Sequence, residues 1–229
     1  MSSELSKLKN GLIVSCQADN DSPLYGSKFM AAMAKSAEIG GAVGIRANGA
    51  NDIKAIKKVV NLPVIGIYKK KFKNSDVYIT PTIKTAVAVI EAGADILALD
   101  ATNRVRPDNL KLEKFISFLK KNYSTPLMAD VSTLEEGINA CNLGFDIVAT
   151  TLSGYTSYSR QINLPDFKLL KDLIKNLSIP VIMEGRISSS KQASKAIQSG
   201  AFAVVIGSAI TRPHLITESY VKVIKTVVK

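Results

Sequence analysis

The chain has 229 residues, of which 46% are hydrophobic and 21% charged, so it can bury a sizeable core and is not a disordered segment. Thirty Lys and Arg against nineteen Asp and Glu give a formal net charge of +11, which attracts nucleic acid, anionic lipid or small phosphates. Most lysines fall in helical stretches without interleaved aromatic residues, which favours a solvated surface over a nucleic-acid interface.

No segment is continuously apolar over the roughly 18 residues that a membrane helix requires, and residues 1–10 lack the apolar core of a signal peptide. The two cysteines, Cys16 and Cys141, are too few for a disulfide framework, and we expect both to be reduced. We therefore expect a cytoplasmic protein with no membrane association.

Apolar runs that end in polar or glycine residues recur eight times along the chain, and each is followed by a helical pattern. The predicted strands cover residues 11–17, 42–48, 62–69, 95–102, 126–131, 146–152, 179–187 and 202–207. The predicted helices cover about 27–39, 51–60, 83–92, 109–121, 132–143, 166–176, 189–199 and 216–228. Eight strand–helix units in one chain of this size predict a single α/β domain over residues 1–229, a parallel (β/α)8 TIM barrel.

Three local signals refine this pattern. Asn51 is a plausible N-cap for the second of these helices, and Ser132 with Glu135 three residues on resembles a capping box. After the third strand, a lysine-rich stretch leads to a short extended piece at residues 77–80, which lengthens the loop at the strand's C-terminal end. Loops at that end of a barrel reach the substrate, so this excursion could fold over the mouth.

Polar side chains end nearly every predicted strand, where a TIM barrel carries its active site. These residues are Gln17, Arg46, Lys69, Asp100, Asp130, Thr151, Glu184 and Arg186. For Asp100 and Asp130, capping of the following loop is an equally good interpretation. Strand alternation places Lys69 on one face with Ile65 and Ile67, and Glu184 on one face with Ile182.

The seventh and eighth strands of such barrels commonly bind phosphate through backbone N–H groups. Gly185 and Gly207 let the backbone approach an anion closely, and Arg186 and Arg212 can neutralise its charge. An extra turn near residues 208–211 adds the N–H of Ser208, and the sequence therefore predicts a phosphate site here.

Strands three and seven are four positions apart in an eight-stranded barrel, so Lys69 and Glu184 should face each other across the mouth. A sugar phosphate held by the loops after the seventh and eighth strands would present its carbonyl end to the centre of the mouth. A neutral lysine there can take or give a proton beside the carbonyl. Partial desolvation or a nearby cation such as Arg46 would lower the pKa of Lys69. Glu184 could act in ring opening or as a second acid or base, and a Schiff base on Lys69 stays open.

Metal and nucleotide chemistry are disfavoured. The chain has one histidine, His214, beside Pro213 beyond the last strand, although an Asp-only magnesium site stays open. No G-x-G-x-x-G opens a strand–helix turn, and we expect no cofactor.

At these residues the chain resembles the N-acetylmannosamine-6-phosphate 2-epimerases of sialic acid breakdown. The matching segments are GLIVSCQ (11–17), GIRA (44–47), LPVIGI (62–67) followed by Lys69, ALDAT (98–102), MAD (128–130), TTLSGYT (150–156), EGR (184–186) and AITRP (209–213). The resemblance implies that a lysine and a glutamate form the catalytic pair, here Lys69 and Glu184. It also implies that Gln17, Arg46 and Asp130 contact the sugar.

Two positions depart from the family pattern. Ser208 stands where the family usually has the second of two glycines, and Tyr68 replaces a more usual aliphatic residue. The first change keeps a backbone N–H in the phosphate loop, and the second should alter the outer face of the barrel.

The sequence thus predicts a cofactor-independent epimerase that interconverts the 6-phosphates of N-acetylmannosamine and N-acetylglucosamine by moving the C2 proton. Thr151 joins the substrate contacts, and Gly185, Arg186, Gly207, Ser208 and Arg212 hold the phosphate. A lysine-dependent aldolase or another phosphosugar barrel is the alternative, and a basic nucleic-acid-binding module ranks lower because no binding motif appears. The apolar C-terminal helix could pack on its own barrel or on a second copy, which leaves a homodimer open.

Overall fold

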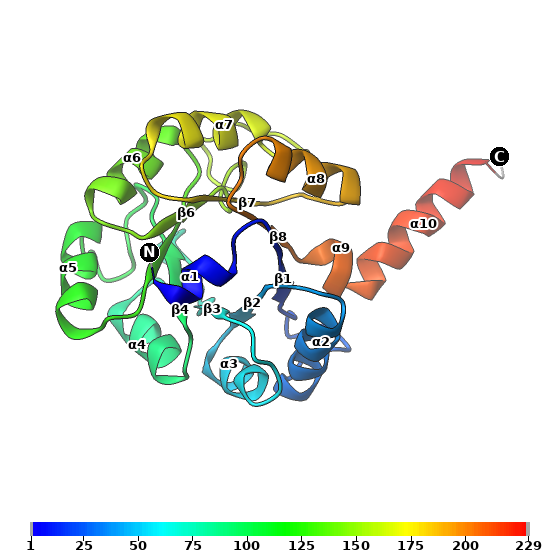
Figure 1. Ribbon diagram of the computed structural model, residues 1–229, viewed down its shortest axis with the longest axis horizontal. Coiled ribbons are helices and arrows are strands. Elements are labelled where there is room, and N and C mark those ends of the chain that lie inside the picture. Colours follow the sequence, from blue (N-terminus) through cyan, green and yellow to red (C-terminus); the bar gives the residue numbers. More distant parts are fainter. Residues whose placement is uncertain (1, 228–229) are drawn as a thin grey trace.

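Eight parallel strands close into a barrel in chain order, β1 to β8, in the computed structural model, which describes residues 2–227 (Figure 1). They are β1 (Leu12–Cys16), β2 (Gly44–Asn48), β3 (Val64–Ile67), β4 (Ile96–Asp100), β5 (Leu127–Asp130), β6 (Ile147–Ala149), β7 (Val181–Glu184) and β8 (Ala203–Ile206). Each strand lies within a predicted range, and the predicted (β/α)8 fold is confirmed.

Helices alternate with the strands and form the outer layer (Figure 1). They are α1 (Ser3–Lys7), α2 (Ser27–Ile39), α3 (Ala50–Lys57), α4 (Ile83–Glu91), α5 (Leu112–Asn122), α6 (Leu134–Asn142), α7 (Phe167–Asn176), α8 (Ser190–Gln198), α9 (Ser208–Thr211) and α10 (Pro213–Val227). Within residues 2–227, none of these helices has the length and apolar character needed to cross a membrane. Cys16 and Cys141 are both free thiols, as expected.

The core divides into two layers that follow the alternation of the strands. Val181 and Met183 pack outward under the helices, whereas Ile182 lies in the cluster that fills the barrel interior. Ile65 and Ile67 of β3 belong to the same inner cluster. Alternate residues of a strand point to one face. Lys69, two residues after Ile67, and Glu184, two residues after Ile182, therefore point into the barrel mouth.

The N-terminal end of the barrel is closed by α1, which the sequence pattern did not reveal (Figure 1). Leu5 and Leu8 are fully buried in the inner cluster. They are three residues apart, so one face of this short helix carries both. Two leucines in a polar, lysine-rich stretch are too weak a signal to predict such a plug.

Several predicted helix starts differ from the structure, and α10 begins at Pro213 instead of about residue 216. The N-cap of α3 is Gly49 instead of Asn51, because the chain enters the helix with a φ of 84° that glycine adopts without strain. The helix predicted from residue 109 begins at Leu112, since Asn109 has a φ of 56° and cannot continue a right-handed helix.

The capping box of α6 is shifted by one residue from the predicted Ser132 and Glu135. Thr133 is the N-cap, and its hydroxyl accepts from the N–H of Glu136 at 3.3 Å. The Glu136 carboxylate accepts in return from the N–H of Thr133 at 3.1 Å. Glu136 is fully buried whereas Glu135 is exposed, so burial selects the glutamate that caps the helix.

Glu136 also joins three loops at the mouth. Its carboxylate accepts from the N–H and hydroxyl of Ser132 at 2.7 and 2.8 Å, from the N–H of Asn103 at 3.1 Å, and from the hydroxyl of Tyr158 at 2.6 Å. These donors follow β5, β4 and β6 respectively. One buried carboxylate thus fixes the loops of three neighbouring strands.

The predicted extended piece at residues 77–80, here called the inserted segment, lies between β3 and β4. The two strands pair only at Ile65 with Ile96 and at Gly66 with Leu97. Beyond these pairs, Ile79 forms an antiparallel bridge with Lys69. The carbonyl of Ile79 accepts from the N–H of Asp100 at 3.0 Å. The excursion therefore reaches the mouth, as expected.

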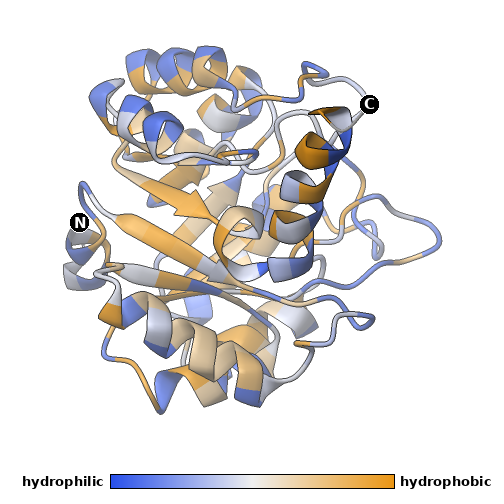
Figure 2. Cartoon of the chain, turned by 90° about the vertical axis from the view of Figure 1, so that its right-hand side faces the viewer, coloured by the Kyte–Doolittle hydropathy of each residue, from blue (hydrophilic) through white to orange (hydrophobic). Residues whose placement is uncertain are grey.

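The last helix, α10, leaves the barrel and projects from its side (Figure 1). Over its described length, residues 213–227, it has no buried residue. Figure 2 shows apolar residues along this helix. The exposed ones are Leu215, Tyr220, Val221, Val223, Ile224 and Val227.

Substituting Glu136 with Ala should lower the free energy of unfolding by about 3 kcal/mol, because several buried donors lose one charged acceptor. Urea denaturation of the variant would measure this loss. Glu135→Ala is the matched control and should change stability by less than about 0.5 kcal/mol, as expected of an exposed side chain. Equal effects of the two substitutions would contradict the assigned cap.

Candidate active site

A cavity of about 480 Å³ opens at the C-terminal ends of the strands. Its walls include Gln17 after β1, Arg46 on β2, Lys69 after β3, Thr151 after β6, Glu184 on β7 and Ser208 after β8. Side chains from β1, β2, β3, β6, β7 and β8, or from the segments that follow them, thus meet in one space. Such a cavity is large enough for a small phosphorylated sugar.

Arg46 lies at the centre of this site and is 1% exposed. Its two terminal nitrogens bind both carboxylate oxygens of Asp130, at 3.0 and 2.6 Å, and one also binds Glu184 at 2.7 Å. Thr151 Oγ1 lies 2.6 Å from the Asp130 carboxylate and 3.2 Å from that of Glu184. A buried guanidinium is therefore matched by two carboxylates across the barrel lumen, which such a charge requires.

The tip of β7 is fixed against β6. The Glu184 N–H donates to Thr150 Oγ1 at 3.0 Å, and the Thr150 hydroxyl donates to the carbonyl of Glu184 at 2.8 Å. Burial raises the pKa of Glu184, the charge of Asp130 raises it further, and the Arg46 guanidinium opposes both. Because burial disfavours its charged form, this carboxyl is a candidate for gaining and losing a proton near neutrality.

The pKa of Lys69 is shifted downward, opposite to that of Glu184. Its backbone N–H donates to Asn48 Oδ1 at 2.7 Å, which ties the end of β3 to β2. Burial lowers the pKa of Lys69, and the charge of Arg46 lowers it further, as the sequence predicted. A lysine in this environment yields a neutral amine more readily than one in water.

The structure brings most predicted site residues into the cavity and places two of them beneath it. Asp130 does not line the cavity; it is fully buried and holds Arg46 and Thr151 from below. Asp100 caps the loop that follows β4, which was one of its two predicted roles. It accepts from the N–H and hydroxyl of Thr102 at 3.0 and 2.6 Å.

Two fully buried side-chain polar atoms in the site have no hydrogen-bond partner within residues 2–227. Gln17 donates through Nε2 to Ser15 Oγ at 2.6 Å, but its buried Oε1 is unpaired. The Nε of Arg46 is likewise buried and unpaired. An unpaired buried polar atom is costly, and a bound ligand can satisfy it. One acceptor and one donor are thus available to a substrate.

The loops after β7 and β8 supply unpaired backbone donors. In the described part of the chain, no hydrogen bond uses the N–H groups of Gly185, Arg186, Gly207 or Ser208. Gly185 has a φ of 110°, which only glycine adopts without strain, and all four residues line the cavity. N–H groups that converge on a cavity suit an anion.

The two arginines at this end have partners of their own. Arg186 donates to the carbonyls of Ser153 and Gly154 at 2.6 and 2.9 Å, and its guanidinium lies 4.1 Å from the centre of the Tyr155 ring. Arg212 forms an exposed ion pair with Asp19 at 2.9 Å. Both arginines line the cavity, and their contact with an anion stays a prediction.

Sequence reasoning missed the four hydroxyl-bearing residues Ser15, Tyr78, Tyr155 and Thr211 of the cavity wall, besides apolar wall residues. Ser15 lies two residues before Gln17 on the same face of β1, so strand alternation would have found it. Tyr78 belongs to the inserted segment, whose position between β3 and β4 depends on tertiary contacts. Together the residues place an amine of lowered pKa, a carboxyl of raised pKa and several unpaired N–H donors in one cavity.

Comparison with known proteins identifies relatives along almost the whole chain. A family model described as "Putative N-acetylmannosamine-6-phosphate epimerase" matches residues 30–226. A protein of Caldanaerobacter subterraneus subsp. tengcongensis, named "Putative N-acetylmannosamine-6-phosphate 2-epimerase", is 54% identical over 222 residues, which cover 96% of this chain and 94% of the relative. A protein of Clostridioides difficile with the same name is 50% identical over 96% of this chain and 99% of its own length.

Solved structures give the same result. The N-acetylmannosamine-6-phosphate 2-epimerase from Clostridium perfringens superposes with a TM-score of 0.93 at 47% identity, over 96% of this chain and 95% of that one. A thiamine phosphate pyrophosphorylase from Pyrococcus furiosus superposes with a TM-score of 0.61 at 18% identity, over 90% of this chain and 89% of that one. The second match reflects the fold alone.

The lowered pKa of Lys69 predicts that replacing this lysine stabilises the protein. Unfolding restores the ordinary lysine pKa, so wild-type stability should rise with pH as Lys69 loses its proton, up to about pH 10.4. Lys69→Met carries no charge, and its advantage over wild type should be largest at low pH and shrink as pH rises through the folded pKa.

Urea denaturation between pH 6 and 10 would measure this difference. The exposed Lys71 supplies the control, because Lys71→Met should show no such pH-dependent gain. A Lys69→Met variant less stable than wild type at pH 7 would contradict the assigned environment of Lys69.

Proposed function

The chain belongs to the N-acetylmannosamine-6-phosphate 2-epimerase family and is an epimerase of N-acetylmannosamine 6-phosphate, and we propose that Lys69 and Glu184 carry out its proton chemistry. The product is N-acetylglucosamine 6-phosphate, the epimer at C2, and the reaction belongs to sialic acid catabolism. The observation that carries this assignment of residues is a lysine with a lowered pKa in the same cavity as a glutamate with a raised one.

The phosphate is held at the ends of β7 and β8. The unpaired N–H groups of Gly185, Arg186, Gly207 and Ser208 supply neutral donors, and Arg212 supplies positive charge. Ser208 departs from the family glycine only by its side chain, so its N–H is retained. Arg186 contributes mainly by its backbone, since its guanidinium donates to the carbonyls of Ser153 and Gly154.

A phosphate at this edge directs the other end of the sugar across the mouth toward β2 and β3. In the open-chain aldehyde, the hydrogen on C2 is acidic because the carbonyl at C1 stabilises the resulting carbanion. The neutral amine of Lys69 removes this proton, and its return to the opposite face of C2 gives the epimer. Positioned proton transfer of this kind contributes typically about 10²–10⁴-fold to the rate.

Glu184 is placed to assist this chemistry. Its raised pKa keeps a proton available for ring opening, in which the ring oxygen gains a proton as the hydroxyl at C1 loses one. Alternatively it gives its own proton to the opposite face of C2, as an acid, and is left as the carboxylate. Both schemes require the carboxyl to remain between Arg46 and Thr151, where it lies at 2.7 and 3.2 Å from them.

The sugar itself is bound by Gln17, Arg46 and Thr151, which line the cavity. The unpaired Oε1 of Gln17 accepts from an O–H or N–H of the substrate, and the unpaired Nε of Arg46 donates to an oxygen. Asp130 acts from beneath, by orienting Arg46 and Thr151. No step of this scheme calls on a cofactor.

Proton NMR in heavy water tests the reaction and the role of Lys69 together. Wild type should convert N-acetylmannosamine 6-phosphate to its C2 epimer and introduce solvent deuterium at C2. Lys69→Ala should lose both activities by about 10²–10⁴-fold. Lys71→Ala, which changes an exposed lysine of the same run, should retain them. Retained deuterium exchange in Lys69→Ala would remove Lys69 from the mechanism.

We also propose that the protein forms a homodimer by exchange of α10. Every described residue of this helix is at least partly exposed, and it carries an apolar stripe that includes Val223 and Ile224. An apolar groove of about 460 Å³ lies between α2, the outer face of β1 and α9. Its apolar walls are Leu12, Val14, Leu24, Phe29, Ala32, Met33, Ala37, Ala42 and Ile210.

The groove and the helix fit each other as two parts of one surface. In a TIM barrel the last helix covers the first and last strands, but here α10 projects away and leaves Leu12 and Val14 of β1 open to the groove. A second copy can place its α10 there while receiving the first copy's helix in return. Such a reciprocal contact is closed and buries both apolar surfaces.

Light scattering coupled to gel filtration should therefore find wild type as a dimer. Substituting Val223 and Ile224 with Asp should shift it to monomer, since each charge would be buried in the partner's groove. Lys225→Asp, a charge change of similar kind outside the apolar stripe, should leave the dimer intact. A monomeric wild type would overturn the proposed exchange.

A further inference from the structure

Tyr78 is an aromatic residue of the cavity wall that has no role in the proposed proton transfer or phosphate binding. It belongs to the inserted segment, lines the same cavity as Lys69 and Glu184, and packs in part against the inner core. Its hydroxyl has no hydrogen-bond partner in the described part of the chain. A polar group that is held in the cavity and left unpaired is available to a substrate.

The backbone that carries Tyr78 is held from both sides. On the β3 side, the Tyr78 carbonyl accepts from the N–H of Lys70 at 2.9 Å, and the N–H of Thr80 donates to the carbonyl of Tyr68 at 2.8 Å. On the β4 side, the hydroxyl of Thr80 donates to the carbonyl of Ala98 at 2.7 Å. The segment is thus built into the barrel wall and is not a free loop.

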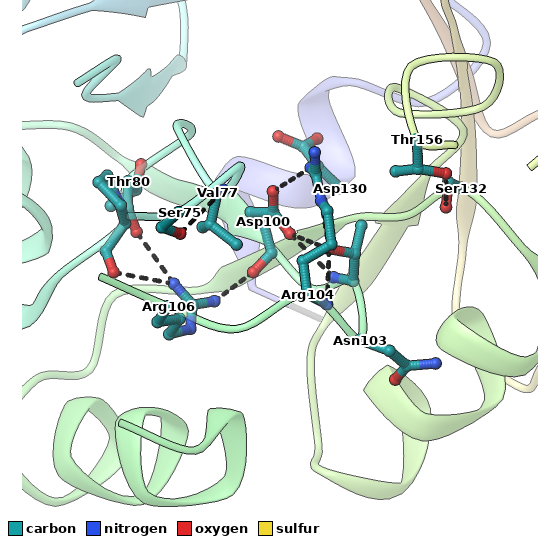
Figure 3. Close-up of polar contacts among 12 residues, drawn as sticks. Ser75, Val77, Thr80, Asp100, Asn103, Arg104, Arg106, Asp130, Ser132 and Thr156 are labelled. Carbon is teal, nitrogen blue, oxygen red and sulfur yellow. Dashed lines mark hydrogen bonds and ion pairs between the residues drawn. The ribbon is translucent and has the colours of Figure 1, made fainter. Parts of the chain in front are cut away.

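Thr80 shows that this placement costs energy. It is β-branched yet has a φ of 47°, a region that such residues rarely adopt and that costs about 1–3 kcal/mol. The buried Arg106 supports this turn by donating to the carbonyls of Thr80, Pro81 and Asp100 (Figure 3). Strain that persists under such support is often found where a side chain must be held for function.

The surroundings of Tyr78 keep its hydroxyl protonated. Burial raises the pKa of Tyr78 to about 12, and the negative charge of Asp130 contributes to the same shift. Arg46 lies near enough for the two groups to interact electrostatically. The phenol is therefore a neutral O–H donor beside the centre of the site at any pH where the protein works.

The reaction requires a hydrogen-bond donor to the oxygen at C1, where negative charge develops. When C2 loses its proton, the electron pair of the C–H bond forms a C1–C2 double bond, and the carbonyl oxygen at C1 becomes an oxyanion. Three of the five N–H bonds of Arg46 are already directed at Asp130 and Glu184, which leaves its Nε–H and one hydrogen of Nη2. Charge that develops in a transition state is best stabilised by donors fixed in advance.

We propose that the Tyr78 hydroxyl donates a hydrogen bond to the C1 oxygen of the substrate and stabilises the enolate. The phosphate lies at β7 and β8, and Lys69 at the end of β3 meets C2. The C1 oxygen, one bond from the carbon next to C2, then lies near Lys69, in the part of the cavity that Arg46 on β2 and Tyr78 after β3 line on either side of it. The proton from C2 goes to the amine of Lys69, Tyr78 keeps its own proton, and protonation of C2 on the other face restores the carbonyl.

This role rests on the proposed function, and Tyr78→Phe tests it because the change removes one oxygen and keeps the ring. We expect kcat for epimerisation and for deuterium exchange at C2 to fall together by about 10²–10³-fold, with KM changed less than about threefold. Tyr68→Phe is the matched control. Tyr68 precedes Lys69 but packs on the outer core, so its variant should keep both rates.

The outcomes separate the two claims. An inactive wild type would overturn the proposed function, and the role of Tyr78 with it. An active wild type with an unchanged kcat in Tyr78→Phe would overturn only the role of Tyr78. A raised KM with unchanged kcat would also overturn it, because the hydroxyl would then bind substrate and transition state equally.

Discussion

The active site depends on one buried cation, the guanidinium of Arg46. Removing this charge from water costs several kcal/mol, and the carboxylates of Asp130 and Glu184 offset that cost at distances of 2.6 and 2.7 Å. The same arrangement sets the proton affinities of the site. Burial and then the charge of Arg46 lower the pKa of Lys69, while burial and the charge of Asp130 raise that of Glu184 against the opposing charge of Arg46. One buried ion cluster thus brings a base and an acid toward the same pH range.

The closed barrel is what makes this cluster possible. Arg46, Asp130 and Glu184 come from β2, β5 and β7, which are not neighbours in the sheet, so their contacts span the lumen. Water must be kept from the cluster for its charges to act strongly on each other. Apolar residues of the inner core fill the lumen below it, and α1 closes the far end of the barrel. The fold therefore supplies both the positions and the low polarity.

Strand alternation and strand ends were enough to predict, from the sequence, most of the polar residues that line this cavity. Lys69 and Glu184 follow inward-facing isoleucines on short apolar runs, and that local pattern alone sets their direction. The depth of Asp130, the cap formed by Glu136 and the position of Tyr78 could not be predicted in this way. Each depends on partners distant in sequence. Asp130 pairs with Arg46, Glu136 accepts from the loops after β4 and β6, and Tyr78 is placed by the gap between β3 and β4.

The two ends of the cavity differ in how firmly they are held, and this difference suits an enzyme. At the proposed phosphate end, Arg212 is paired with the largely exposed Asp19, and an exposed pair contributes only about 0–1 kcal/mol. A phosphate can therefore take that arginine from Asp19 at small cost. At the reacting end, Arg46 is enclosed by two carboxylates, and the inserted segment carries strain that its neighbours maintain. Substrate binding can thus adjust the loose end while the groups proposed to meet C1 and C2 stay in place, which is the condition for stabilising a transition state more than the ground state.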